Sequence, residues 1–180
     1  MTTTKNKTFL NPETLLKEIP LEQGMTVADF GCGNGYYSVA AAVQIGIKGQ
    51  VYAVDILEEA LSQTATLAKL VRVPNVSTVA CDLEQLGNCH IADTSCDLVI
   101  VASLLHQAKN LDNILREAYR VLKTGGKILV VEWKPDAAFG PEASARIHPD
   151  EAAKLLGRYG FRPTKDLTAG SFHYALLYQK

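Results

Sequence analysis

Apolar runs that suit strands alternate with segments of helical periodicity along most of the chain. The segment 97–103 contains a continuous apolar run, which is typical of a central parallel strand buried on both faces. The segment 111–122 carries apolar side chains every three or four positions, which predicts an amphipathic helix. By the same reasoning we expect strands at 26–30, 50–56, 76–81, 97–103, 127–133, 161–167 and 172–178, and helices at 36–45, 58–71, 111–122 and 149–159.

The residues that begin, end and connect these segments complete the predicted fold. Asn11 and Pro12 suit the N-cap and first position of one more helix, and residues 123–126 (Lys-Thr-Gly-Gly) are typical of a helix C-cap. The connection 168–171 is too short for a crossover helix, so the last two strands should be antiparallel. The pattern predicts an α/β fold: a Rossmann-like, doubly wound sheet of seven strands, mostly parallel, with a C-terminal antiparallel β-hairpin. We expect a single domain over residues 1–180.

Composition and charge exclude several classes of protein. The chain has 18 Lys and Arg against 19 Asp and Glu, a formal net charge of −1 and 47% hydrophobic residues. This balance argues against a disordered chain and against a general nucleic-acid partner. No apolar run approaches the roughly 18 residues of a membrane helix, so no membrane insertion is expected. Residues 1–7 are polar and unlike a secretory signal, so we expect a cytoplasmic protein.

The four cysteines are Cys32, Cys81, Cys89 and Cys96, and they form no Cys-x-x-Cys pair. Their spacing is unlike that of a zinc site, and no metal is expected. We therefore predict four free thiols that behave as small apolar residues in a reducing compartment.

A glycine-rich loop follows the first predicted strand. Its glycines are Gly31, Gly33 and Gly35, while position 36 is Tyr, so the dinucleotide-binding pattern Gly-x-Gly-x-x-Gly is not met. The Gly-Lys-Ser/Thr of a phosphate-binding P-loop is also absent. Asp29 lies at the mouth of the loop, where an acid disfavours a pyrophosphate and favours a ligand with an ammonium group.

Four further motifs accompany this loop. An acid, Asp55, ends the second strand 20 residues after Gly35, and Cys81-Asp82-Leu83 follows the third strand. The segment 97–106 runs from the fourth strand to His106, and 115–131 contains a helix, a Gly-Gly turn and a strand. With these motifs the chain resembles the class I S-adenosylmethionine-dependent methyltransferases, in their small type 11 or UbiE-like branch, over about residues 12–180.

The resemblance implies S-adenosyl-L-methionine as cofactor and S-adenosyl-L-homocysteine as product. It implies that Asp29 lies near the cofactor's ammonium group, that loop amides face its carboxylate, that Asp55 accepts from the ribose hydroxyls and that Asp82 reads adenine. The alternatives are that Asp29 caps a turn, that Asp55 caps the next helix and that Asp82 is an ordinary turn residue. The full set of implied cofactor-binding residues is Asp29, Gly31, Cys32, Gly33, Asn34, Gly35, Asp55, Ile56, Cys81, Asp82, Leu83 and Ser103.

Methyl transfer needs a base only where the acceptor loses a proton, and His106, just after the fourth strand, is the catalytic candidate. It is equally compatible with a packing role, and His148 and His173 are secondary candidates. The Asn/Asp-Pro-Pro-Tyr/Phe motif of amino methylation is absent after the fourth strand, as are the catalytic cysteine of cytosine methylation and an acidic cluster for Mg²⁺. The cysteines are also poorly placed for arsenite methylation. What remains is a small-molecule, quinone-like or unknown acceptor, and we expect a small-molecule substrate.

Two other functions remain open at this stage. One is an S-adenosylmethionine-binding regulatory protein without turnover, and the other is an NAD-dependent oxidoreductase on the same fold. Little of the chain lies outside the core, so we expect residues 1–25, a tail and a helix, to pack on or over the cofactor site. We expect a monomer or a homodimer.

Overall fold

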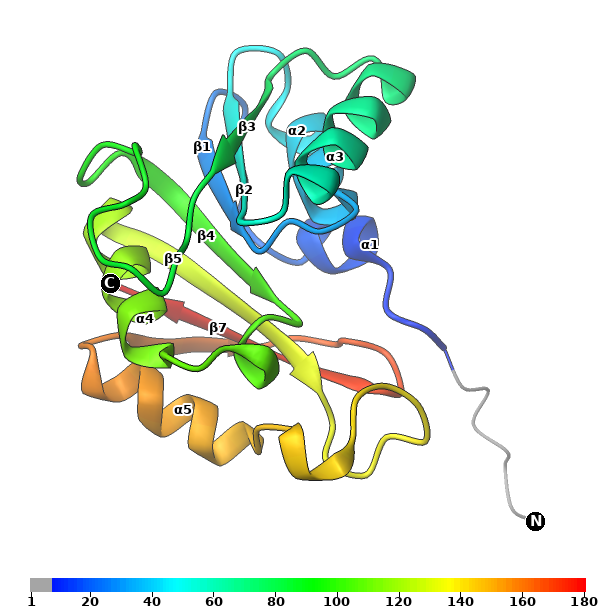
Figure 1. The fold of residues 1–180 in the computed structure, drawn as a ribbon, viewed down its shortest axis with the longest axis vertical. Helices are drawn as coiled ribbons and strands as arrows, with labels where there is room; N and C mark the ends of the chain where they lie inside the picture. Colours follow the sequence, from blue (N-terminus) through cyan, green and yellow to red (C-terminus); the bar gives the residue numbers. More distant parts are fainter. Residues whose placement is uncertain (1–7) are drawn as a thin grey trace.

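The computed structural model describes residues 8–180, which form a seven-stranded sheet with helices on both faces (Figure 1). The order of the strands across the sheet is β3-β2-β1-β4-β5-β7-β6. The strands are β1 (Thr26–Phe30), β2 (Gln50–Asp55), β3 (Val76–Ala80), β4 (Cys96–Ala102), β5 (Leu122–Trp133), β6 (Arg162–Asp166) and β7 (His173–Gln179). The helices are α1 (Pro12–Lys17), α2 (Tyr36–Ile45), α3 (Glu58–Val71), α4 (Leu111–Val121) and α5 (Pro149–Arg158), with 3-10 turns η1 (Leu105–Gln107) and η2 (Ala143–Ala145).

The direction of the strands confirms the predicted fold class. Strands β1 to β5 pair in parallel, and β7 runs antiparallel to both of its neighbours, β5 and β6. The sequence pattern did not reveal that β7 inserts between β5 and β6. This insertion sets Trp133, at the end of β5, opposite His173, at the start of β7. The C-terminal hairpin therefore contributes a side chain to the edge of the sheet where β1 and β4 end.

Apolar side chains bury both faces of the sheet. On one face Ile114 of α4 and Leu155 of α5 belong to one cluster with Phe30 of β1. On the other face Leu15 of α1 and Ala41 of α2 belong to a second cluster, and Figure 1 shows α1, α2 and α3 grouped apart from α4 and α5. Helices on both faces explain why the central strands are apolar without alternation.

The junction between α4 and β5 differs from the prediction. We expected residues 123–126 to cap the helix, but α4 ends at Val121 and the chain enters β5 directly, with Leu122 already extended at φ −72° and ψ 134°. Leu122 pairs with Cys96 of β4 and Lys127 pairs with Leu98, so the register shifts and residues 123–126 form an irregularity within β5. Gly126 is required there because a Cβ atom would approach the carbonyl oxygen of Lys123 to 2.9 Å. The local C-cap signal is overridden by strand pairing.

The prediction of four free thiols is wrong for two of them. Cys81 and Cys89 form a disulfide, with their Cα atoms 5.2 Å apart. Cys32 and Cys96 are free and buried, as expected. The bond closes the irregular segment after β3 on itself, a contact between two loop positions that carries no sequence motif.

Candidate functional site

Two cavities meet at the glycine loop, at the edge of the sheet where β1, β2 and β4 end. The first, which we call the Asp55 cavity, has a volume of about 450 Å³. The second, the Asp29 cavity, has a volume of about 630 Å³. The residues that line both of them are Gly31, Gly33, Asn34 and Gln107. The position at the carboxyl ends of parallel strands is the usual ligand site of an open α/β sheet.

The carboxylate of Asp55 is held by two backbone groups. Its Oδ2 accepts from the N–H of Gly33 at 3.0 Å, and its Oδ1 accepts from the N–H of Leu57 at 3.0 Å. Leu57 itself is the N-cap of α3 and no side chain caps that helix, so Asp55 braces the turn before the helix rather than capping it. Each carboxylate oxygen accepts more than one hydrogen bond, which leaves Asp55 able to accept from a ligand as well.

Asp82 also lines the Asp55 cavity and is fixed in a turn. Its Oδ1 accepts from the N–H of Glu84 at 2.9 Å, and its Oδ2 accepts from the side-chain amide of Gln85 at 2.8 Å. The turn role considered for this residue is therefore present, alongside its place at the cavity. Ile56 and Leu83 add apolar walls to the same cavity.

Asp29 is a buried acid at the second cavity. Its side chain is only 1% exposed, and its Oδ2 accepts from the hydroxyl of Ser38 at 2.6 Å. Burial raises the pKa of this carboxyl from 3.8 to about 6; the Ser38 bond opposes the rise and the charge of Asp55 adds to it. The charged form of Asp29 is thus poorly compensated by the protein, which is the electrostatic state expected of a group that binds a cation.

The backbone of the glycine loop differs from the expectation that its amides face a ligand carboxylate. The N–H groups of Gly31 and Cys32 both donate to the carbonyl oxygen of Val54, at 2.8 and 2.9 Å. The N–H of Gly33 donates to Asp55. These bonds tie the loop to the end of β2. With the N–H of Gly35, which donates to the carbonyl oxygen of Cys32 at 2.8 Å, four of the loop amides are engaged within the protein.

Close packing against α3 explains two residues of the loop. Glycine is required at position 35 for two reasons. A Cβ atom there would meet the Cα atom of Thr64 at 2.9 Å, and the residue adopts φ +80°, which other residue types rarely do. The Cys32 thiol lies 3.5 Å from the Thr64 hydroxyl, and burial raises its pKa to about 12. Cys32 is therefore an unreactive packing residue of the loop. Gly35, unlike its neighbours, lines neither cavity.

His106 makes its main contact with a residue that the sequence reasoning missed. Its Nδ1 lies 2.8 Å from the Oε2 of Glu132, whose Oε1 accepts from the N–H of Leu105 at 2.7 Å. Glu132 lies on β5 and is fully buried. The only sequence signal was a single acid inside an apolar strand. As a carboxylate it fixes the proton on Nδ1 and leaves Nε2 as the acceptor, although His106 lines neither of the two cavities.

His173 is brought to the Asp29 cavity together with Ser103. The imidazole is 8% exposed and its ring centroid lies 4.1 Å from that of Trp133. Its Nδ1 is buried without a hydrogen-bond partner among residues 8–180. Burial and the charge of Lys134 lower its pKa, so the ring is neutral at pH 7. Ser103 adopts φ +52°, a strained backbone for this residue type, at the point where β4 ends.

The N-terminal segment from Thr8 onward forms one wall of the Asp29 cavity. Thr8 and Ser171 exchange two hydrogen bonds, from Thr8 N to Ser171 Oγ at 3.0 Å and from Ser171 N to Thr8 O at 2.9 Å. Phe9 is anchored beside Phe172, with their ring centroids 5.0 Å apart, and it lines the cavity. The part of the predicted cover over residues 1–7 lies outside the described residues.

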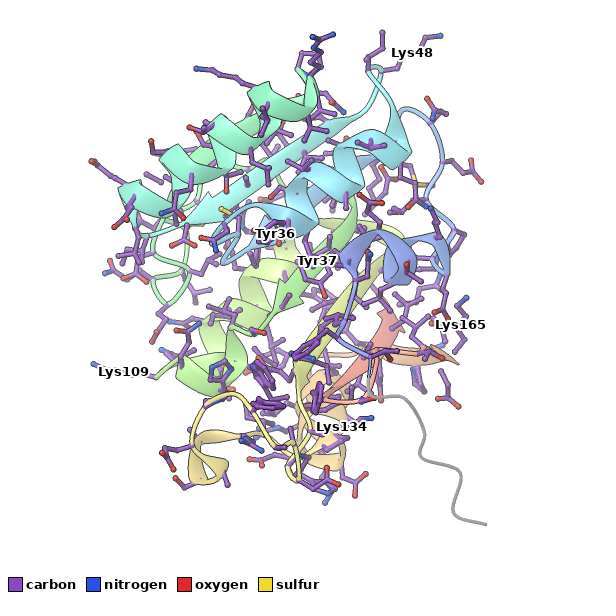
Figure 2. The ribbon with its side chains drawn as sticks, turned by 90° about the vertical axis from the view of Figure 1, so that its right-hand side faces the viewer. Tyr36, Tyr37, Lys48, Lys109, Lys134 and Lys165 are labelled. Carbon is purple, nitrogen blue, oxygen red and sulfur yellow. A yellow bond between two sulfur atoms is a disulfide. The ribbon has the colours of Figure 1, made fainter. Side chains whose placement is uncertain are left out.

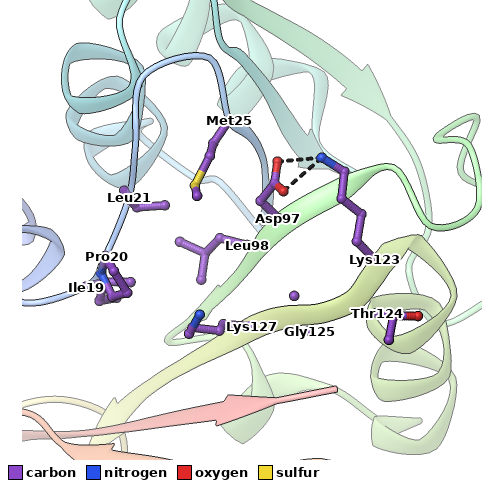
Figure 3. A pocket seen from close by; sticks show the side chains of 11 residues that line it. Ile19, Pro20, Leu21, Met25, Asp97, Leu98, Lys123, Thr124, Gly125 and Lys127 are labelled. Atoms are coloured by element: carbon purple, nitrogen blue, oxygen red, sulfur yellow. Dashed lines mark hydrogen bonds and ion pairs between the residues drawn. The ribbon is translucent and has the colours of Figure 1, made fainter.

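A smaller cavity of about 150 Å³ lies at the opposite edge of the sheet, where β1, β4 and β5 begin (Figure 3). Both oxygens of Asp97 lie 2.8 Å from the Nζ of Lys123, and Asp97 also accepts from the N–H of Thr26. Asp97 and Lys123 are thus paired with each other, while Lys127 also lines this cavity. Among residues 8–180, no group of three or more His, Cys, Asp or Glu side chains could hold a metal ion.

Comparison with known proteins identifies this architecture. The model of a family described as a methyltransferase domain matches residues 21–154. The chain belongs to the S-adenosylmethionine-dependent methyltransferases. Within this methyltransferase family, a solved structure of a SAM dependent methyltransferase from Aquifex aeolicus superposes with a TM-score of 0.86 and 26% identity, over 95% of this chain and 90% of that one.

Two curated methyltransferases show the range of acceptors among the relatives. The demethylmenaquinone methyltransferase of Lactobacillus johnsonii is 31% identical over 147 residues, which cover 78% of this chain and 58% of that protein. The arsenite methyltransferase of Halobacterium salinarum is 28% identical over 163 residues, which cover 84% of this chain and 40% of that protein. The chain therefore spans about half the length of these curated relatives.

Proposed function

We propose that this methyltransferase domain binds S-adenosylmethionine across the two cavities and transfers its methyl group to a small-molecule acceptor. The observation that carries the proposal is the under-compensated charge of Asp29 at one cavity, joined through the glycine loop to Asp55 and Asp82 at the other. The cofactor supplies an activated methyl group on a cationic sulfur, so the protein has mainly to align the reactants and exclude water.

The residues fit the parts of the cofactor in charge and polarity. Asp29 gains a cation where the protein gives it hydrogen bonds from the hydroxyl and the backbone of Ser38 but no positive charge among the causes that set its pKa. Asp55 is braced by two amides and retains acceptor capacity for the ribose hydroxyls. Asp82 accepts from an amino group, and the apolar Ile56 and Leu83 suit the faces of adenine. Of the rest of the predicted cofactor-binding set, Gly31, Cys32, Gly33, Asn34, Cys81 and Ser103 line the cavities and are proposed to contact the cofactor by packing, whereas Gly35 supports the loop from outside them.

His106 is proposed as the base for an acceptor that must lose a proton. Its hydrogen bond to the buried Glu132 orients the ring and supports the positive charge that forms when Nε2 takes the proton. His173, neutral and at the Asp29 cavity, is the second candidate to contact the acceptor. Glu132 is a positioning residue, because it acts through His106.

The cysteine arrangement supports an acceptor other than arsenite. Two of the four cysteines are joined as Cys81–Cys89, and the other two are buried. Burial raises the pKa of Cys96 to about 11, so this thiol, like Cys32, remains protonated. An organic small molecule that carries a nucleophilic oxygen, nitrogen or carbon is therefore the acceptor class we propose.

The setting that we propose for the protein is argued from the character of its helices and from its net charge. No helix within residues 8–180 has the length and apolar character needed to cross a membrane. We propose a cytoplasmic monomer or homodimer without a nucleic-acid partner, which is supported by the near-zero net charge of −1. A regulatory protein that binds the cofactor without turnover is the alternative, and the cofactor-site geometry is common to both.

Calorimetry with S-adenosylhomocysteine and with NADH tests the cofactor. We expect binding of the first alone, and its loss in Asp55→Ala. Asp166→Asn, an exposed acid on the edge strand β6, serves as the matched control and should bind normally. Binding of NADH instead would reject the proposal. A screen of metabolites with a labelled methyl donor then separates turnover from binding alone, because only an enzyme consumes the donor.

A further inference from the structure

The amino-acid tail of the proposed cofactor carries a carboxylate that needs a hydrogen-bond donor. Four of the five loop amides expected to supply it already donate within the protein: those of Gly31 and Cys32 to Val54, that of Gly33 to Asp55 and that of Gly35 to Cys32. Among the loop amides of residues 31–35, this leaves the N–H of Asn34 for the ligand. The carboxylate must also lie close to Asp29, because the ammonium and carboxylate groups of the tail share one carbon atom. Two negative groups at such a short separation repel each other unless a donor stands between or beside them.

Tyr37 supplies an uncommitted donor at this place. It lies beside Tyr36 at the beginning of α2 (Figure 2) and lines the Asp29 cavity. Its hydroxyl is buried and has no hydrogen-bond partner among residues 8–180. A buried hydroxyl without a partner is unfavourable and calls for an explanation, and a ligand in the adjoining cavity provides one.

The electrostatics of Tyr37 fit a donor rather than an acceptor. Burial, followed by the charge of Asp29, raises the pKa of its phenol well above the ordinary value of 10. The group therefore stays protonated at all physiological pH values and offers one O–H. Tyr37 and Asp29 line the same cavity, so both are placed to contact one zwitterionic ligand there.

We propose that the Tyr37 hydroxyl binds the carboxylate of the cofactor's amino-acid tail while Asp29 binds its ammonium group. The inference rests on the proposed function, since it concerns the same cofactor. It adds a residue outside the family motifs considered from the sequence, and it supplies a side-chain donor where most of the loop amides are engaged. Tyr36, which is 63% exposed and lines the same cavity, is the neighbouring phenol that lacks the burial.

The test compares two ligands and two variants by isothermal titration calorimetry. The ligands are S-adenosylhomocysteine and its decarboxylated analogue, which keeps the ammonium group. In Tyr37→Phe we expect the affinity for S-adenosylhomocysteine to fall about 10- to 100-fold, as for a lost hydrogen bond to a charged group. The affinity for the decarboxylated analogue should not change. Tyr119→Phe, at a tyrosine that lines neither cavity, should bind both ligands as the wild type does.

Thermal unfolding without ligand separates this role from a structural one. Removal of an unpaired buried hydroxyl should leave the Tm of the ligand-free protein unchanged or raised, whereas loss of a structural hydrogen bond would lower it. The inference about Tyr37, but not the proposed function, would be overturned by either of two results. One is equal affinity of wild type and Tyr37→Phe for S-adenosylhomocysteine, and the other is an equal loss of affinity for both ligands in Tyr37→Phe. Failure of the wild type to bind either ligand would overturn the proposed function, and the inference with it.

Discussion

Asp29 gives the sharpest test of the charge arrangement at the site. Folding carries this carboxyl from water to a buried position whose pKa is about 6, against 3.8 for the ordinary group. At about 1.4 kcal/mol for each pH unit, this difference costs the ligand-free protein about 3 kcal/mol of stability when Asp29 is ionised. Because the folded-state pKa is the higher one, the cost is absent below pH 3.8, grows between pH 3.8 and 6, and is complete above pH 6.

The perturbation is Asp29→Asn, which keeps the shape of the side chain and an acceptor for the Ser38 hydroxyl. We expect the variant to be more stable than the wild type by up to about 3 kcal/mol at pH 7, or roughly 6–12 °C in Tm. The advantage should shrink by about 1.4 kcal/mol for each pH unit below pH 6 and vanish near pH 4. The assay is chemical denaturation of the ligand-free protein between pH 4 and pH 7.5.

The same substitution should weaken the binding of S-adenosylhomocysteine, since the ammonium group loses its counter-charge. In the wild type, affinity should fall about tenfold for each pH unit below pH 6, as Asp29 must be ionised to bind. Asp166→Asn, on the exposed edge strand, should show neither effect. A variant that is less stable than the wild type at pH 7, or whose advantage does not depend on pH, would refute the reasoning.

Three further results are expected. Cys89→Ser should lower the free energy of unfolding by about 2.5 kcal/mol, the value for closing a loop as short as that between Cys81 and Cys89. Denaturation in a dithiol reductant should abolish this difference between the variant and the wild type. Glu132→Gln should lower kcat about 10²- to 10⁴-fold through His106 and leave S-adenosylhomocysteine affinity unchanged, as labelled methyl transfer and calorimetry would show. Gly35→Ala should destabilise the protein by more than 1 kcal/mol in thermal unfolding, because a Cβ atom there meets the backbone of α3.

Each of these results has a control. For the disulfide, Cys96→Ala changes a free, buried thiol, so its difference in stability from the wild type should be the same with and without the reductant. For Glu132, the direct substitution His106→Asn should be no less damaging to kcat; if Glu132→Gln were fully active, its positioning role would be wrong. For the loop, alanine at Gly87, which has open space around its Cβ position, should be tolerated better than alanine at Gly35.

Much of the fold was predictable because each element carries its own signal. The strands β1 and β4 are short apolar runs, and helix α4 shows apolar periodicity, so each was placed to within a residue or two. The Asn11 cap formed as expected, with its side chain accepting from Thr14 N at 3.2 Å. Such features depend on neighbours in the chain, and local physics is therefore enough to determine them.

The sequence by itself determined the class of fold and the edge of the sheet where its acids gather, because parallel strands that alternate with helices end at one edge. Only the tertiary structure decided that β7 enters between β5 and β6, that Cys81 reaches Cys89, and that Glu132 supports His106. These contacts join positions whose local sequence gives no sign of the partner. They form only when the whole sheet is assembled, since burial and strand pairing across the domain, rather than local preference, select them.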